Sequence, residues 1–327
     1  MAEKVAILLA AGISKRMKTK LPKVLHEACG RPMLAYVLDA CRSVGVEKIY
    51  VVVGFGAEQV QQRFSDASDI VWVHQAEQLG TAHAVNCCRE HLQDFSGQTL
   101  VLCGDGPLIR AKTLEILIDK HETEQAAATL ATALLDDPSG YGRIVRDASG
   151  NLQGIVEDSD CDPDQKAINE VNPSYYLFDN QLLFSALEQV KPDNAKGEFY
   201  VTDTLALLLA QGHKVAAVTA VQPDEAVSVN SRDQLAFAGK LLQQRIQQEL
   251  MASGVTIVDP NTTWIDNRAK IGQDTIIEPF TYISGKVIIG TRCRIGPFAC
   301  LRHGTDVADG AVVGAFTESQ STGTMQP

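Results

Sequence analysis

A cluster of basic residues follows the first apolar run of this 327-residue chain. The run ends in Leu9, Ala10, Ala11 and Gly12, and Lys15, Arg16 and Lys23 come shortly after it. Small side chains at the end of a strand let backbone amides approach phosphate oxygens, whose charge nearby cations can neutralise. The glycines of a Walker A loop and of a Gly-x-Gly-x-x-Gly fingerprint are missing. Taken alone, the segment indicates either a phosphate-binding loop or a strand-to-helix turn beside solvated lysines.

A carboxylate stands at the end of a later apolar run, in Gly104-Asp105. Carboxylate oxygens are ligands that divalent cations prefer, and phosphoryl-type transfer needs such a cation. An isolated aspartate at a strand end is, however, more often a helix cap. The position of Asp105 alone therefore leaves a metal ligand and a helix cap both open.

The elements that must position these residues alternate from Val5 to about Val218, as in a parallel sheet covered by helices. The predicted strands are Val5–Leu9, Lys48–Val53, Ile70–Val73, Thr99–Leu102 and Lys214–Val221. The predicted helices are Pro32–Val44, Ala57–Phe64, Thr81–Leu92, Ala111–Gln125 and Gln181–Glu188. Ligands bind at strand ends in such a sheet, so the loops after Leu9, Val53 and Leu102 are expected to form the site.

A six-residue repeat marks the C-terminal part of the chain. Its aliphatic positions are Ile265, Ile271, Ile277, Ile283, Ile289, Ile295, Leu301, Val307 and Val313. This period is typical of a hexapeptide β-helix, in which each hexapeptide forms one flat face and its aliphatic side chain points inward. A coincidental run of short strands is the alternative. We predict a Rossmann-like α/β domain with a mostly parallel sheet at 1–230, a linking helix at 231–252, a short left-handed parallel β-helix at 253–316 and a mobile polar tail at 317–327.

Composition excludes several classes of protein. The net charge of -11 argues against a broad nucleic-acid-binding surface. The eight cysteines include no Cys-x-x-Cys pair, which favours reduced thiols over a zinc site or a disulfide framework. The longest apolar stretches are too short for a signal peptide or a membrane span. We therefore expect a cytoplasmic protein that is neither exported nor membrane-spanning.

Several motifs resemble those of one enzyme family. The loop after Leu9 resembles the signature of sugar-phosphate nucleotidyltransferases. Further motifs resemble the bacterial N-acetylglucosamine-1-phosphate uridyltransferases and follow in the family's order: Gln75–Ala84, Gly104-Asp105, Gly140–Ile144, Gly154–Glu157, Gly197–Asp203 and Val229–Arg232. The resemblance covers almost the whole chain, including the hexapeptide region.

The resemblance implies a role for each motif. Gln75 and the Gly80 backbone are implied to read uracil, because a carboxamide offers both a donor and an acceptor. Asn230 matches the family's second metal ligand, which makes a Mg²⁺ site with Asp105 the favoured interpretation. The implied nucleotide-binding residues are Leu9, Ala10, Ala11, Gly12, Gln75, Gly80 and Thr81. The implied sugar-binding residues are Gly142, Glu157, Asn172, Tyr200 and Thr202.

The implied reaction converts UTP and N-acetylglucosamine 1-phosphate to UDP-N-acetylglucosamine and pyrophosphate, for cell-envelope precursors. The sugar phosphate attacks the α-phosphorus in line, so that no protein nucleophile or general base is required. Catalysis would consist of positioning and of charge neutralisation by Mg²⁺, Arg16 and Lys23. His83 and Cys103 are interpreted as structural residues.

The sequence departs from the family at several positions. Ser14-Lys15 replaces Gly-Thr, Cys103 replaces a common Tyr, Gly106 replaces an aliphatic residue, and Pro173-Ser174 replaces Thr-Gly. Asp158-Ser159-Asp160 lacks the Lys that lies near the sugar phosphate in related enzymes. Lys196 stands where the family usually has Gln, and our hypothesis is that it partly replaces the lost charge; a solvated loop lysine is the alternative.

Bifunctional members of the family continue their β-helix through more coils that build an acetyltransferase site. This sequence stops after about three coils, so we expect uridylyl transfer without acetyltransferase activity. The family's β-helices usually pack as trimers, which implies a homotrimer. Two other functions stay open: transfer to another sugar 1-phosphate, and a catalytically weakened regulatory homologue that binds nucleotide-sugar.

Overall fold

The computed structural model describes residues 2–13, 15–194, 196–319 and 323–325. The chain divides into two compact units. The first comprises Met1–His26 and Met33–Gln234, and the second comprises Glu27–Pro32 and Leu235–Pro327.

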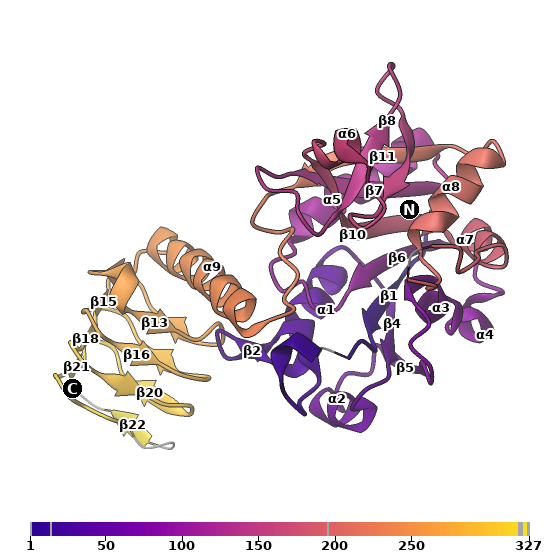
Figure 1. The fold of residues 1–327 in the computed structure, drawn as a ribbon. Coiled ribbons are helices and arrows are strands. Elements are labelled where there is room, and N and C mark those ends of the chain that lie inside the picture. The colour runs from indigo at the N-terminus through magenta and orange to yellow at the C-terminus, as the bar shows by residue number, and fades with distance from the viewer. Residues whose placement is uncertain (1, 14, 195, 320–322, 326–327) are drawn as a thin grey trace. The chain divides into compact units, whose positions relative to one another are not determined.

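The first unit is built on a nine-stranded sheet whose main path runs β11-β7-β10-β6-β1-β4-β5 (Figure 1). The strands are β1 (Lys4–Ala10), β4 (Lys48–Val53), β5 (Ile70–His74), β6 (Gln98–Cys103), β7 (Ala128–Leu134), β8 (Gly142–Arg146), β9 (Leu152–Val156), β10 (Glu170–Asp179) and β11 (Val215–Val221). In this path β10 runs antiparallel to both neighbours, and the other pairs are parallel. The predicted mostly parallel sheet is therefore confirmed. β8 and β9 form an antiparallel extension from β10.

Helices cover both faces of this sheet. One face packs against α1 (Met33–Ser43), α2 (Ala57–Arg63) and α5 (Ala111–Glu124). The other packs against α3 (Thr81–Asn86), α4 (Arg89–Leu92), α7 (Asn180–Leu187) and α8 (Thr202–Ala210). Ala6 and Leu8 of β1 point into the first core and Val5 and Ile7 into the second, so this strand is apolar on both sides. No helix in the described ranges is both long and apolar enough to cross a membrane.

The carboxyl ends of four parallel strands meet at one edge of the sheet. Leu9 pairs with Cys103, Ala10 with Val53, and Val53 with His74. The loops that follow β1, β4, β5 and β6 therefore leave the sheet side by side. The prediction named the loops after Leu9, Val53 and Leu102 and did not include the loop after β5.

Some elements of the first unit differ from the prediction. The predicted helix Thr81–Leu92 is two helices, because α3 ends at Asn86 and α4 begins at Arg89. The strands β7 to β10 and the helices α6 (Pro163–Lys166) and α8 were not predicted. The β7 sequence, Ala-Thr-Leu-Ala-Thr-Ala-Leu, mixes a strong helix former with a β-branched residue, so local propensity does not decide between the two structures.

The second unit contains a hairpin from the N-terminal part of the chain. The hairpin consists of β2 (Glu27–Ala28) and β3 (Arg31–Pro32). Between them, the Cys29 thiol donates to the carbonyl oxygen of Gly239 at 3.3 Å, and the Asn267 amide donates to the Cys29 carbonyl oxygen at 3.0 Å. Gly30 has a φ of +82°, and a Cβ there would collide with Asp266. Because of these contacts the hairpin belongs to the second unit and not to the domain predicted at 1–230.

A long helix, α9 (Arg232–Ala252), confirms the helix predicted at 231–252. The side-chain oxygen of Gln234, in the first turn, accepts from the Asn230 backbone amide at 2.8 Å.

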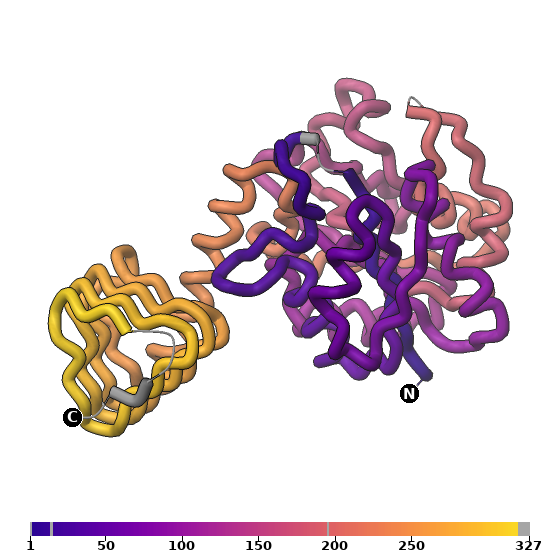
Figure 2. Tube along the Cα trace, turned by 90° about the horizontal axis from the view of Figure 1, so that it is seen from below, coloured from indigo at the N-terminus to yellow at the C-terminus, as the bar shows by residue number. Residues whose placement is uncertain are grey.

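The hexapeptide region forms three parallel sheets, one for each face of the β-helix, and Figure 2 shows its coils stacked one behind another. The strands are β12 (Thr256–Ile257), β13 (Trp264–Ile265), β14 (Lys270–Ile271), β15 (Ile276–Ile277), β16 (Tyr282–Ile283), β17 (Ile288–Ile289), β18 (Arg294–Ile295), β19 (Cys300–Leu301), β20 (Thr305–Val307), β21 (Val312–Val313) and β22 (Gly323–Met325). Ile265 pairs with Ile283, which pairs with Leu301, and all three are fully buried. The predicted inward stacking is therefore confirmed.

The coil geometry continues past residue 316, where the sequence pattern predicts a polar tail. Ser319 takes the next inward position and is 4% exposed, with its hydroxyl 2.6 Å from that of Thr305. β22 pairs in parallel with β20. A buried serine fits this position because its hydroxyl has a partner. Residues 320–322, 326 and 327 of the predicted tail lie outside the described residues.

Candidate active site

A cavity of about 250 Å³ opens where β1, β5 and β6 end. All seven residues predicted to bind the nucleotide line it, namely Leu9, Ala10, Ala11, Gly12, Gln75, Gly80 and Thr81. Lys23 and Asp105, the predicted phosphate cation and metal ligand, line the same cavity. The structure therefore brings together predicted residues from four separate segments.

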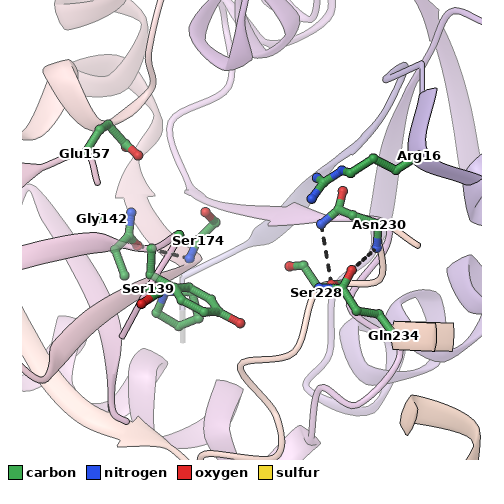
Figure 3. Close-up of a pocket in the computed structure, with 12 residues that line it drawn as sticks. Arg16, Ser139, Gly142, Glu157, Ser174, Ser228, Asn230 and Gln234 are labelled. Atoms are coloured by element: carbon green, nitrogen blue, oxygen red, sulfur yellow. Dashed lines mark hydrogen bonds between the residues drawn. The ribbon is translucent and has the colours of Figure 1, made fainter. Parts of the chain in front are cut away.

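A second cavity, of about 350 Å³, contains most of the other predicted residues. Arg16, Gly142, Glu157, Asn172 and Asn230 line it. Figure 3 shows Arg16 and Asn230 on one side of this cavity and Gly142 and Glu157 on the opposite side. The predicted cation and metal ligand thus face the predicted sugar-binding residues across open space.

A third cavity, of about 170 Å³, lies between the other two. It shares Leu9, Thr81 and Cys103 with the first cavity and Glu157 and Ser174 with the second. The predicted sugar-binding residues Tyr200 and Thr202 line it as well. The third cavity therefore adjoins both the cavity of the nucleotide residues and the cavity of the sugar residues.

Lys23 joins the two predicted metal ligands. Its ammonium group forms an ion pair with Asp105 Oδ2 and donates to Asn230 Oδ1 at 2.9 Å. The Lys23 and Asp105 side chains are only 14% and 13% exposed. The Val229 amide donates to the Asp105 carbonyl oxygen at 3.1 Å, and Gln234 holds the Asn230 backbone. Asp105 and Asn230 are thereby held with their oxygens directed at one cation.

These oxygens suit a divalent metal ion. Asp105 Oδ1 is buried and has no hydrogen-bond partner within the described residues, although a buried carboxylate oxygen normally has one. Within the described ranges no group of three or more His, Cys, Asp or Glu side chains lies close enough to hold a metal. A site with one carboxylate and one amide oxygen fits Mg²⁺, which keeps several of its waters and takes further ligands from phosphates.

Gln75, the predicted base reader, is 3% exposed and is fixed by two neighbours. Its Nε2 donates to the Gly80 carbonyl oxygen at 3.3 Å and lies 2.9 Å from His83 Nδ1. Gly80 has a φ of +121°, and a Cβ there would lie 2.4 Å from the carbonyl oxygen of Phe199. The position therefore requires glycine. Thr81 Oγ1 accepts from the Val201 amide at 2.9 Å, which ties the loop to the segment before α8.

The predicted sugar-binding side chains differ in whether their polar groups have hydrogen-bond partners. Asn172 donates to the Tyr176 hydroxyl at 2.6 Å and accepts from the Ser174 amide at 3.0 Å. The Tyr200 hydroxyl is buried without a partner in the described residues, and burial raises the pKa of Tyr200 to about 12. Burial also raises the pKa of Glu157. The unpartnered hydroxyl and the destabilised carboxylate both favour a ligand with polar groups.

Lys196 lies beside these residues but does not line the cavities described above. Its side chain is exposed, and its Nζ is 6.0 Å from the centre of the Tyr200 ring. The charge of Lys196 lowers the pKa of Glu157, against the larger effect of burial. The Asn194 side chain holds this loop by accepting from the amides of Lys196 and Glu198 at 3.2 Å.

Two of the residues that depart from the family motifs, Cys103 and Ser174, line the third cavity. Burial raises the pKa of the Cys103 thiol to about 12, so the thiol stays neutral. Ser174 adopts a left-handed backbone with a φ of +67° at a position where the family usually has Gly. Asp158 pairs with Arg143 at 3.0 Å, and Ser159 is exposed. Ser14 lies outside the described residues.

Two glutamines and one histidine belong to the site although the sequence analysis assigned them no ligand or contact there. Gln78 lines the first cavity, Gln234 lines the second, and His83 contacts Gln75. Gln78 and His83 lie within the Gln75–Ala84 motif, so their closeness to Gln75 in the sequence could have identified them as site residues. Gln234 lies in the first turn of α9 and lines the second cavity, and no local sequence pattern indicates this position.

Comparison with known proteins places this geometry in context. A model of the nucleotidyl transferase family matches residues 5–265, and a bacterial transferase hexapeptide model with six repeats matches residues 268–303. The hexapeptide match agrees with the predicted left-handed β-helix. The chain is 48% identical over 297 residues to a protein named bifunctional protein GlmU from Geobacillus sp. (strain WCH70).

Other relatives carry the same name. The chain is 47% identical over 346 residues to the protein from Pelotomaculum thermopropionicum, covering 96% of the chain and 75% of the relative. It is 41% identical over 353 residues to the protein from Listeria monocytogenes serotype 4a, covering 98% and 77%. The match spans 64% of the length of the relative from Geobacillus sp. and 66% of the length of a relative from Geobacillus thermodenitrificans (strain NG80-2). Since one family model matches most of the chain and these relatives match more than nine-tenths of it, the chain belongs to the nucleotidyl transferase family, as a homologue of the GlmU proteins.

Proposed function

We propose that this chain transfers the uridylyl group of UTP to N-acetylglucosamine 1-phosphate, giving UDP-N-acetylglucosamine and pyrophosphate. One observation carries the proposal. The seven predicted nucleotide-binding residues line a single cavity together with Lys23 and Asp105. A nucleoside triphosphate needs both a base-reading end and a cationic end, and this cavity has Gln75 and Lys23 to supply them.

The proposed reaction needs positioning and charge neutralisation. An oxygen of the sugar phosphate attacks the α-phosphorus, the bond from that phosphorus to the bridging oxygen breaks, and pyrophosphate leaves with the electron pair. Lys23 and Arg16 would bind phosphate oxygens and stabilise the charge that develops during transfer. The backbone of Leu9 to Gly12 would hold the triphosphate beside them.

Asp105 and Asn230 are the proposed Mg²⁺ ligands, and a bound Mg²⁺ would stabilise negative charge on the phosphate oxygens. Lys23 already forms an ion pair with Asp105 and a hydrogen bond with Asn230. The same two oxygens therefore already bind one cation in the structure. Lys23 would release them when it turns to the phosphates.

The sugar would occupy the second and third cavities. The Glu157 carboxylate and the unpartnered Tyr200 hydroxyl would hydrogen-bond to sugar hydroxyls, and the Gly142 backbone lies beside them. Lys196 would approach the sugar phosphate from the neighbouring loop. Cys103 and Ser174 stand where the family has other residues, so a different sugar 1-phosphate is the second candidate substrate.

We also propose that the protein assembles as a homotrimer through its β-helix. Phe280, Phe298 and Phe316 stack on the outside of successive coils, with ring centres 4.9 Å and 5.2 Å apart. Their side chains are exposed, at 54%, 47% and 80% respectively. Exposed aromatic ladders of this kind favour burial against another subunit.

A substrate panel tests the proposed activity. Pyrophosphate release is measured with Mg²⁺ for UTP, CTP, GTP, ATP and dTTP, each paired with the 1-phosphates of N-acetylglucosamine, glucosamine, N-acetylgalactosamine and glucose. We expect the fastest release with UTP and N-acetylglucosamine 1-phosphate. Faster release with another sugar supports the second candidate. Binding of nucleotide-sugar with no release from any pair supports a catalytically weakened regulatory homologue.

A further inference from the structure

His83 forms a contact that the proposed reaction does not require. We infer that His83 is a positioning residue that orients the Gln75 carboxamide and thereby sets the preference for UTP over CTP. The inference rests on the proposed function, because it assumes that Gln75 reads the N3 edge of the base. It adds a residue that contacts the base-reading side chain and does not line the nucleotide cavity.

The orientation of the Gln75 carboxamide follows from its two neighbours. The Gly80 carbonyl oxygen can only accept a hydrogen bond, so the atom that faces it at 3.3 Å must be the amide nitrogen Nε2. The same Nε2 lies 2.9 Å from His83 Nδ1 and carries a second hydrogen for it. Both contacts use Nε2, and neither uses Oε1.

His83 can accept this hydrogen bond in one protonation form. In that form Nδ1 carries a lone pair and the ring hydrogen lies on Nε2. With His83 in this tautomer, a rotation of the Gln75 carboxamide by 180° would place Oε1 against the lone pairs of both Gly80 O and His83 Nδ1. His83 therefore opposes that rotation together with Gly80.

This orientation distinguishes two pyrimidines. Uracil carries a hydrogen on N3, which Oε1 of Gln75 can accept, whereas cytosine has a lone pair on N3 that Oε1 would repel. The rotated carboxamide would present Nε2 instead and would suit cytosine. By opposing rotation of the Gln75 carboxamide, His83 would therefore favour uracil over cytosine.

His83 acts from behind Gln75. Gln75, Gly80 and Thr81 line the first cavity, but His83 does not appear among the described residues that line it. The His83 side chain is half-buried in the first turn of the short helix α3 (Thr81–Asn86), and Gln75 itself is 3% exposed. His83 is therefore placed to orient the base reader without touching the nucleotide.

Two substitutions separate the hydrogen-bond acceptor from the size of the side chain. His83→Leu removes the acceptor, and His83→Asn keeps one, because an asparagine Oδ1 can take the place of histidine Nδ1. Dissociation constants for UTP and CTP are measured by calorimetry on the full chain with Mg²⁺, with circular dichroism as the folding control. We expect His83→Leu to reduce the UTP-to-CTP preference about tenfold and His83→Asn to keep it within about threefold of wild type.

A double-mutant cycle tests the route through Gln75. In a Gln75→Leu background, His83→Leu should leave the UTP-to-CTP ratio unchanged, because the group that His83 orients is gone. An unchanged ratio in the folded His83→Leu protein, or additive effects in the cycle, would overturn the inference while leaving the proposed function intact. A wild-type protein that binds CTP as tightly as UTP would overturn the proposed uridylyl transfer and this inference with it.

Discussion

Replacement of Lys23 by methionine should weaken catalysis and at the same time strengthen metal binding by the nucleotide-free protein. Methionine keeps most of the length of the side chain and removes its charge. In the structure the Lys23 ammonium contacts Asp105 Oδ2 and, at 2.9 Å, Asn230 Oδ1. A metal ion that binds these oxygens must first displace the ammonium group.

The contacts set the size of the effect. A hydrogen bond to a charged group contributes about 1.5 to 3 kcal/mol, and each 1.4 kcal/mol corresponds to a factor of ten. Removal of the competing cation should therefore tighten metal binding by about tenfold to a hundredfold. Without metal, Lys23→Met leaves the Asp105 carboxylate, 13% exposed, without its partner, which should lower the free energy of unfolding by about 1 to 3 kcal/mol.

Manganese provides the assay, because bound and free Mn²⁺ are distinguished by electron paramagnetic resonance. Wild type and Lys23→Met are titrated without nucleotide, and urea unfolding is measured with and without Mn²⁺. Lys20→Met is the matched control, since Lys20 is an exposed lysine of the same loop. Equal or weaker Mn²⁺ binding by folded Lys23→Met would refute the shared cation position.

Three further predictions concern the sugar side and the scaffold. Lys196→Gln should raise the KM for the sugar 1-phosphate by roughly one to two orders of magnitude with little change for UTP, as measured by steady-state kinetics against Lys191→Gln, a substitution of an exposed lysine. Burial raises the pKa of Glu157, so folding favours the protonated Glu157 carboxyl group. The resulting contribution to the free energy of unfolding is present below the ordinary glutamate pKa and is lost as the pH rises through the raised pKa. Glu157→Gln should therefore resist urea better than wild type at neutral pH but not at a pH below the ordinary value; a difference that persists in acid would contradict this. Gln125→Gly should stabilise the protein by about 0.5 to 1 kcal/mol in urea unfolding, because Gln125 ends α5 with a φ of +49°.

The repeat and the strand ends were predictable because both are local in sequence. The six-residue period determines which side chains point inward, and Ile265, Ile283 and Leu301 stack as it requires. The parallel strands bring Leu9 beside Cys103, so residues just after each strand had to converge. The cavity near Asp105 follows from this rule.

Other features depend on contacts between distant parts of the chain. Lys23 meets Asn230 across 207 positions, and no sequence pattern specifies that pairing. The Glu27–Pro32 hairpin belongs to the second unit because of contacts with Gly239 and Asn267, which also lie far along the chain. Ser319 looked like the end of the repeat because it is polar, although a hydrogen-bonded serine fits the inward position.

Phosphorus NMR of the complete reaction detects both products of the proposed uridylyl transfer in one sample. Wild-type protein is mixed with Mg²⁺, UTP and N-acetylglucosamine 1-phosphate, and Asp105→Asn is examined in parallel. We expect equal amounts of pyrophosphate and of a nucleotide-sugar diphosphate in wild type, with formation at least a hundredfold slower in the variant. Absence of the diphosphate signal in wild type, or equal rates in the two proteins, would contradict this expectation.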